Sequence, residues 1–389
     1  MTAIIIGMNA MIGAGIFSLA CSLCTQVGPA GLISYLFAFV AIWCIAQSLA
    51  RVAFVYPQEG SFYAYTKLWA GNTMGCLAAG SYFVGILMAM GLLCKMSGSY
   101  LQSLFPYLSA YTWGFCVLAL LIIVNLFGMA LSKIGQYVLI IFTILPLVII
   151  AGMCMTKMQL TNLAPFMPHG PWAMVKMAKI VVFGFFGFEC TLSLFNILEN
   201  PEKSLPRTIT ISLLLVGLIY FLFIGSVMLA IPQTVFAEHP TITITEAMNF
   251  LFPNNIFLLH SITFCIILAL VGTIHSVIWS ISELLLSYSK NIRWPARVAS
   301  MVTQKAMVLV VGMVILLSYI FITSYDVFFS LAAVTVMFAL LTSMIPLLFL
   351  KNEWRSGQNV ITVLGLLFGL IIFSIAVETL IENVIKIVS

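Results

Sequence analysis

The feature that most constrains this chain is a succession of long apolar runs that carry almost no charge. Each run has about 20 residues or more, which is the length that an α-helix needs to cross a bilayer. The 389 residues include 16 Lys or Arg and 11 Asp or Glu, whereas 63% are apolar. A soluble domain needs far more surface charge. The pattern predicts an all-α integral membrane protein and excludes a disordered, collagen-like or nucleic-acid-binding chain.

Pro, Gly, Asn and charged residues divide the apolar sequence into about eleven predicted transmembrane helices. They lie near residues 3–23, 30–55, 76–101, 111–131, 134–156, 172–195, 208–231, 256–289, 306–323, 326–350 and 359–385. The first run has no basic residue before it, so we expect a membrane span there and not a cleaved signal peptide.

The distribution of Lys and Arg predicts the orientation, because cytoplasmic loops carry the excess of positive charge. With a cytoplasmic N-terminus, eleven basic residues lie at inner loops and span ends and four at the outer side, while Lys95 lies within a span. The stretches 101–112 and 232–255 contain no Lys or Arg, as expected of outer loops. We therefore expect a multi-pass protein of the plasma membrane, with a bacterial inner membrane favoured.

Two predicted spans carry paired glycines near their middle, Gly13 and Gly15 in the first and Gly184 and Gly187 in the sixth. Glycine is about 0.8–1.0 kcal/mol less favourable than alanine inside a helix, so the pairs favour unwinding. Unwound backbone in a membrane must line a cavity or be buried in protein. Freed N–H groups suit a carboxylate and freed carbonyls suit an ammonium group, so two breaks predict a site for a zwitterion.

The two broken spans open two successive units of five helices, which is the sequence sign of an inverted-repeat transporter. We expect one membrane domain with a first repeat over 1–156, a second over 172–350 and an additional helix in 351–389. The alternative is that the glycines form packing faces where neighbouring helices touch.

Motifs around the breaks resemble the amino acid, polyamine and organocation (APC) transporter superfamily. Residues 13–17 resemble its glycine-rich first-helix motif, and Gly-Pro-Ala at 28–30 follows where its second helix opens. Residues 57–63 resemble its inner loop after helix two. The most specific match joins 183–189, like its sixth helix, to 200–207, like the following loop. The resemblance ends before the last span, where the family commonly has two helices.

This resemblance implies a LeuT-type five-plus-five fold with broken helices 1 and 6, centred here on Gly13 and Gly184, and an amino acid permease or antiporter. Phe183 would be an aromatic gate over the substrate. The other implied substrate-binding residues are Ala14, Gly15 and Ile16 for the carboxylate, carbonyls of Ile12, Phe183, Gly184 and Phe186 for the amino group, and Gly85, Met88, Ala89 and Met90 for the side chain.

Ionisable residues inside spans are candidates for coupling or gating, because a charge at the membrane centre costs about 2.5–3.5 kcal/mol or more. Glu189 follows the sixth-span break, where exclusion of water would allow it to carry a proton, or where it could simply cap unpaired amides. The resemblance implies coupling at this position in some members. Lys95 could pair with a carboxylate or extend to an interface. The lysine that replaces Na⁺ in some relatives corresponds to Thr143 here.

Three further features give competing hypotheses. His275 could relay protons or hydrogen-bond a neighbouring helix. Trp279 could form a second aromatic gate or an ordinary packing contact. Cys21 and Cys24 form a CxxC without a second pair or nearby His ligands, so we expect no metal or redox site.

We predict a secondary transporter that moves amino acids or related amines by alternating access, driven by protons or by exchange, without a cofactor. The alternative is a membrane-embedded enzyme or a channel, but the sequence contains no HExxH, GxSxG or selectivity-filter motif. The expected partners are the small-molecule substrate, the lipid bilayer and protons, and a homodimer is left open. The apolar pocket favours neutral or apolar amino acids, while Glu189 leaves cationic substrates open.

Overall fold

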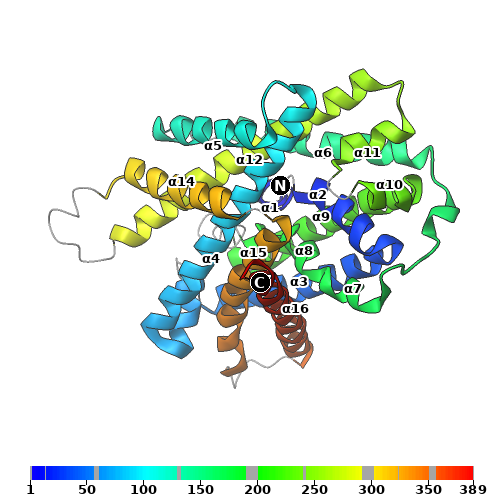
Figure 1. Ribbon diagram of the computed structural model, residues 1–389. Helices are drawn as coiled ribbons and strands as arrows, with labels where there is room; N and C mark the ends of the chain where they lie inside the picture. Colours follow the sequence, from blue (N-terminus) through cyan, green and yellow to red (C-terminus); the bar gives the residue numbers. More distant parts are fainter. Residues whose placement is uncertain are drawn as a thin grey trace.

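The protein is helical in the computed structural model (Figure 1), and the described part of the chain contains no strand. The structure describes residues 2–13, 15–56, 61–128, 133–189, 200–239, 242–290, 302–322, 324–349 and 356–388. The expectation of an all-α membrane protein is confirmed.

Seven helices in this part of the chain are long and apolar enough to cross a membrane. They are α3 (Gly31–Val55), α4 (Ser61–Leu104), α9 (Pro201–Ala230), α12 (Ile256–Lys290), α14 (Gln304–Phe321), α15 (Tyr325–Met344) and α16 (Ser356–Val388). Shorter apolar helices are α2 (Gly15–Gln26) and α5 (Ala110–Leu126), and α6 (Lys133–Met155) contains a shorter apolar stretch at Ile140–Met155. The chain is a multi-pass membrane protein, while the count of eleven crossings stays a prediction.

The first and sixth predicted spans are both interrupted at their glycines. In the first, α1 (Thr2–Met11) ends before Gly13 and α2 begins at Gly15. In the sixth, α7 (Gly170–Lys176) and α8 (Ala178–Phe183) are followed by short turns up to residue 189. The predicted breaks are therefore confirmed in the described residues.

Gly187 brings the two breaks into direct backbone contact. Its φ of 108° lies in the left-handed region that favours glycine. A Cβ atom at this position would lie 2.1 Å from the carbonyl oxygen of Ala10, at the end of α1. Because backbone atoms fill that space, a side chain at residue 187 would force the two broken segments apart.

The remaining short elements connect the long helices. They are η1 (Gly28–Ala30), η2 (Leu160–Leu163), α10 (Gln233–Glu238), α11 (Ile244–Leu251) and η4 (Ile345–Phe349). Within α4, Gly71 has φ 79° and ψ 179°, so this long helix is kinked there. The part of α4 after Gly71 coincides with the predicted span near 76–101.

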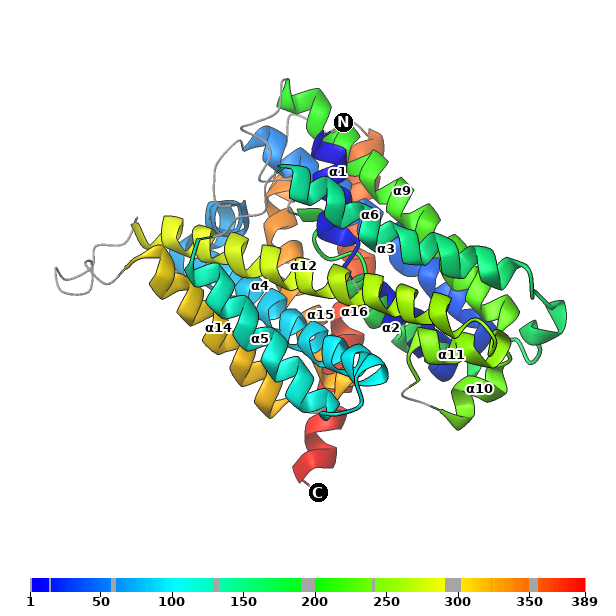
Figure 2. The same ribbon diagram turned by 90° about the horizontal axis from the view of Figure 1, so that it is seen from above.

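Two groups of helices surround the broken segments (Figure 2). In one group α4 contacts α5, α12 and α14, and in the other α9 contacts α3 and α6. Of the broken helices, α1 contacts α6 and α9 of the second group, while α8 contacts α3 of that group and also α15, which packs along α4 of the first group. The start of α1 and the end of α16 lie at opposite ends of the molecule in Figure 2.

Large apolar side chains on the outer faces of the bundle remain exposed. Leu120 on α5, Ile141 on α6 and Leu218 on α9 expose 59%, 60% and 57% of their surface. Such exposure is unfavourable in water but suits contact with lipid chains. The faces of the same helices that point inward pack in the apolar core around the breaks.

Candidate substrate site

A cavity of about 200 Å³ lies where the two broken segments meet α4 and α12. Sites for drug-sized ligands commonly have about 300–1,000 Å³, so this cavity suits a smaller molecule. Its lining residues are Asn9, Ala10, Met11, Gly13, Gly15, Ile16, Tyr82, Ile86, Ala89, Met90, Leu93, Phe183, Gly184, Phe186, Gly187, Glu189, Thr273, Ser276, Val277, Ser280 and Ile281.

Most of the site residues expected from the sequence line this one cavity. They are Gly13, Gly15 and Ile16 at the first break, Ala89 and Met90 on α4, and Phe183, Gly184, Phe186 and Glu189 around the second break. Ile12 is buried beside the first break but is not part of the lining. Ala14 lies outside the described residues.

Two expected pocket residues on α4 lie away from the cavity. A Cβ atom on Gly85 would lie 2.2 Å from Oγ1 of Thr335, so Gly85 allows α4 to pack closely against α15. Met88 is half-buried and packs against the apolar core. The face of α4 that meets the cavity instead carries Tyr82, Ile86 and Leu93 together with Ala89 and Met90.

Lys95 and Trp279, the other two expected gating residues, also lie outside the cavity lining. The Lys95 ammonium lies 5.3 Å from the ring centroid of Tyr319 and 5.7 Å from that of Phe328, which are cation–π distances. Among the described residues, no carboxylate lies within ion-pair distance of Lys95. The Trp279 ring lies near Gly128 at the end of α5.

The start of α2 supplies the groups that suit a carboxylate. The first N–H groups of any helix lack partners within the helix and carry its positive dipole end. Because Gly15 and Ile16 begin α2 and line the cavity, this positive end lies at the cavity wall. An anionic group in the cavity can therefore accept hydrogen bonds from backbone amides without any basic side chain.

The carbonyl groups at the ends of α8 and α1 are less free than the sequence suggests. The Phe183 carbonyl accepts a hydrogen bond from the Phe186 amide at 3.2 Å, and that of Val181 accepts one from the Gly184 amide at 3.0 Å. In the first break, the Met11 carbonyl accepts from the Tyr220 hydroxyl at 3.1 Å. An ammonium group would have to use second lone pairs of such carbonyls or other acceptors.

The α12 wall adds hydroxyl groups that the sequence reasoning missed. Thr273, Ser276 and Ser280 lie on one helix face and line the cavity. The buried Ser276 hydroxyl has no hydrogen-bond partner among the described residues. Small polar side chains at helical spacing within an apolar span were the signal that could have identified this wall.

Glu189 is buried and joins the second break to α4. One carboxylate oxygen accepts a hydrogen bond from the Tyr82 hydroxyl, and the other accepts one from the Gly187 amide, both at 2.9 Å. The carboxylate thus caps an amide freed by the break, which is the structural role considered for it. Tyr82 was not identified from the sequence, because nothing local relates it to residue 189.

Phe183 lines the cavity and packs against α15. Its ring contacts Phe329 at a centroid distance of 5.0 Å and an interplanar angle of 83°, and Phe186 at 6.1 Å. A Cβ atom on Gly15 would lie 3.0 Å from the Phe183 ring, so the ring sits directly against the start of α2. The resemblance implied an aromatic gate at this residue, and the ring lies at the cavity edge.

His275 lies next to the cavity wall residues but is not part of the lining. Its Nδ1 atom is 2.9 Å from the amide nitrogen of Asn125 on α5. This contact is the interhelical hydrogen bond considered as an alternative to proton relay.

Broken helices that meet at a small cavity inside a multi-pass bundle are typical of transporters with discontinuous membrane helices. A solved structure of a Na⁺-coupled sialic acid symporter, in a substrate-bound outward-open state, matches with a TM-score of 0.63 and 12% identity. The match covers 97% of this chain and 89% of that one, and at this identity it concerns the fold alone.

A family model described as amino acid permease matches residues 1–386, so the chain belongs to the amino acid permease family. The branched-chain amino acid permease BcaP of Bacillus subtilis is 25% identical over 62% of this chain and 57% of its own length. The amino-acid permease RocE of the same organism is 24% identical over 72% of this chain and 63% of its own. The chain thus spans less than two thirds of these relatives, which are permeases and not enzymes.

Proposed function

We propose that this protein is a secondary transporter that carries neutral amino acids across a bacterial plasma membrane by alternating access. The observation that carries the proposal is the cavity between the start of α2 and the turns after α8. A helix N-terminus at a small, mostly apolar cavity combines what a zwitterion with an apolar side chain needs.

The substrate carboxylate would accept hydrogen bonds from the amides of Gly15 and Ile16. The amino group would donate to the Ser276 hydroxyl and to backbone carbonyls near Phe183, within reach of the same cavity. The side chain would lie against the apolar face of α4, at Ile86, Ala89, Met90 and Leu93.

The surroundings of Glu189 favour a neutral over a cationic substrate. Both oxygens of this carboxylate already accept hydrogen bonds, from Tyr82 and from the Gly187 amide. A cationic side chain would have to share or displace these donors, whereas an aliphatic one needs no such exchange. The similarity to a branched-chain amino acid permease supports aliphatic substrates.

We place the N-terminus in the cytoplasm on the basis of the Lys and Arg distribution. In that orientation α12 enters from the outside at Ile256, so its cavity residues 273–281 lie in its inner half. The exposed Ser280 is the innermost hydroxyl of this wall. The cavity would therefore open to the cytoplasm, with the Phe183 ring closing its outer side.

Two five-helix repeats, 1–156 and 172–350, would rearrange around this site, with 351–389 as an additional helix. Protons are the proposed coupling ion, and Glu189 is the proposed carrier. Protonation adds an O–H donor and makes the carboxyl group a weaker acceptor, so the hydrogen bonds from Tyr82 and the Gly187 amide would weaken or rearrange.

Uptake into proteoliposomes tests this function. Vesicles preloaded with unlabelled leucine, isoleucine or valine should accumulate labelled leucine, and an inward proton gradient should accelerate uptake. Arginine and lysine should compete much more weakly than isoleucine. If no amino acid of a complete panel is taken up with preloading or with a proton gradient, the proposed function is wrong.

A further inference from the structure

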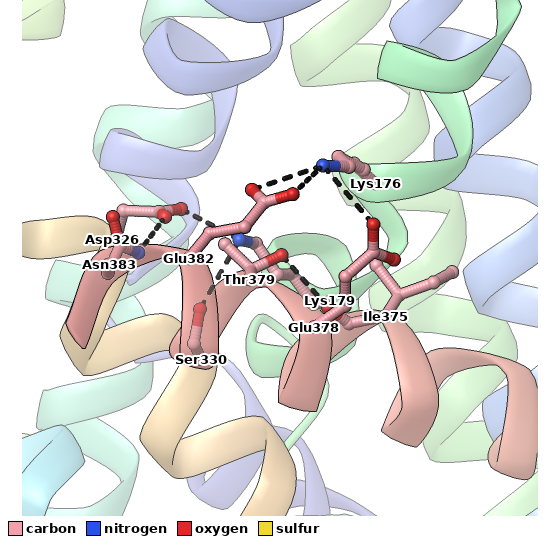
Figure 3. A network of polar contacts seen from close by, with 9 residues as sticks. All are labelled: Lys176, Lys179, Asp326, Ser330, Ile375, Glu378, Thr379, Glu382 and Asn383. Atoms are coloured by element: carbon pink, nitrogen blue, oxygen red, sulfur yellow. Dashed lines mark hydrogen bonds and ion pairs between the residues drawn. The ribbon is translucent and has the colours of Figure 1, made fainter. Parts of the chain in front are cut away.

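The segment that precedes the second break is joined to α15 by an ion pair between a buried lysine and a partly exposed aspartate (Figure 3). Lys179 on α8 is 3% exposed, and its Nζ atom lies 2.9 Å from Oδ1 of Asp326. The same ammonium lies 3.3 Å from the Ser330 hydroxyl, one turn further along α15. Asn383 on α16 donates a hydrogen bond of 2.9 Å to the other oxygen of Asp326. Three helices thus meet at one charged group.

On α8, this ion pair lies one helical turn from Phe183, whose ring lies at the edge of the cavity. Lys179 precedes Phe183 by four residues on α8, so the two side chains share a face. On α15, Phe329 lies between Asp326 and Ser330 in sequence and contacts the Phe183 ring. The contact between α8 and α15 therefore has two layers, the ion pair and the aromatic pair, and the aromatic pair borders the cavity.

Because Lys179 is buried, its charge is stabilised only while α8 and α15 remain in contact. A buried ammonium is tolerated where a carboxylate and further hydrogen bonds compensate for the lost water. Movement of α8 away from α15 would separate Lys179 from both Asp326 and Ser330. The Asp326 side chain is already 30% exposed, but the separated Lys179 ammonium would need water, which reaches it only if the space between the two helices opens to the aqueous phase.

We propose that Lys179 and Asp326 form a latch that holds the outer side of the cavity closed, and that opening to the outside requires this pair to separate. The proposal rests on the proposed transport function and orientation. Lys179 does not line the cavity, whereas Phe183 on the same face of α8 does. Lys179 is therefore a positioning residue that would act by holding α8, and with it Phe183, in place.

A second ion pair beside the latch provides a matched control. Lys176 on α7 lies 3.0 Å from Oε1 of Glu382 and 3.8 Å from Oε1 of Glu378, both on α16. Its side chain is 27% exposed and those of the two glutamates are 46% and 47% exposed. Exposed pairs of this kind contribute little, because water solvates their charges when they separate.

Side-specific labelling of a cysteine at residue 330 tests the latch. Ser330 is fully buried against Lys179, so the thiol of the Ser330→Cys variant reports whether the space behind the pair is open. A membrane-impermeant maleimide is added to either side of oriented vesicles containing the full chain. The parent chain without this substitution gives the background, to which the exposed Cys76 and Cys116 contribute.

Adding Asp326→Asn to Ser330→Cys should raise labelling at residue 330 from the outer side by about tenfold, because the buried Lys179 ammonium is left unpaired. Asn383→Ala, measured in parallel, should raise it less, since it removes only a neutral donor to Asp326. The combination Lys179→Met with Asp326→Leu should raise it less than Asp326→Asn alone, because no charge then remains buried. Lys176→Met should change it by less than about twofold.

Three results would overturn the latch. The first is unchanged labelling with both Asp326→Asn and Asn383→Ala, the second is an equal rise with Lys176→Met, and the third is a rise from the inner side alone. Labelling requires no substrate, so it reports on the latch even if amino acid transport is not found.

Discussion

At the level of single residues, the Glu189 carboxylate links the backbone of the second break to a side chain of α4. It holds the Gly187 amide at the second break and the Tyr82 hydroxyl on α4. Gly187 in turn lies against the carbonyl of Ala10 at the end of α1. A change of charge at this one carboxylate would therefore be felt by both broken segments and by α4, which is what a coupling group requires.

We expect Glu189→Gln to remove the dependence of uptake on external pH while retaining exchange of preloaded substrate. The amide keeps the shape of the side chain but cannot bind or release a proton. Rates of labelled leucine uptake and exchange, measured across a pH series, check this. Tyr82→Phe is the control, because it removes one donor but leaves the titratable carboxyl. A pH profile like that of the wild type in Glu189→Gln would reduce Glu189 to a cap.

Gly15→Ala should weaken substrate binding by about three- to tenfold. The added Cβ lies 3.0 Å from the Phe183 ring, so the ring must shift at the edge of the cavity. Gly152→Ala on α6 is the matched control, since no atom lies within 4 Å of a Cβ there. Equilibrium binding of labelled leucine to the two variants checks this, and equal affinities would contradict the placement of the substrate beside Gly15.

At the scale of elements, Gly85 shows how a residue within a correctly predicted helix can be assigned to the wrong face. Its place on α4 suggested a pocket position, but its Cβ direction faces Thr335 and Val336 of α15. Which face of a buried, nearly uniformly apolar helix meets a cavity depends on the rotation of that helix, which the apolar pattern does not encode.

Gly85→Ala should therefore reduce stability without weakening substrate binding. Overpacking of a close helix contact destabilises by about 1–3 kcal/mol. Gly80→Ala on the same helix has no atom within 4 Å of its Cβ and should be neutral. Thermal unfolding in detergent, combined with leucine binding, checks this pair. A loss of binding at unchanged stability in Gly85→Ala would return this residue to the pocket.

The breaks in the first and sixth spans were predictable because their cause is local. Paired glycines in an apolar run lower helix stability at that place, whatever the surroundings. The partners of the breaks were not predictable in this way. Tyr82 reaches Glu189 across 107 residues of sequence, and Lys179 reaches Asp326 on a different helix. Such contacts depend on how the helices are arranged, and no local pattern in either segment indicates the partner.

At the scale of the whole molecule, the helix arrangement, the family match and the cavity agree on a transporter fold. The family model extends over residues 1–386, although the chain spans only 57% to 63% of BcaP and RocE. The cavity lies between the two groups of helices, where a relative movement would expose it to one side or the other. Alternating access requires such a placement.

Binding of labelled leucine to the purified protein tests whether a neutral amino acid occupies this cavity. Ala89→Phe adds a ring where Ala89 lines the cavity, while Leu120→Phe adds bulk on an exposed face of α5. We predict at least about tenfold weaker binding for Ala89→Phe, or about 1.4 kcal/mol, and unchanged binding for Leu120→Phe, with both proteins folded. Wild-type affinity in a folded Ala89→Phe protein would show that the substrate does not bind in this cavity.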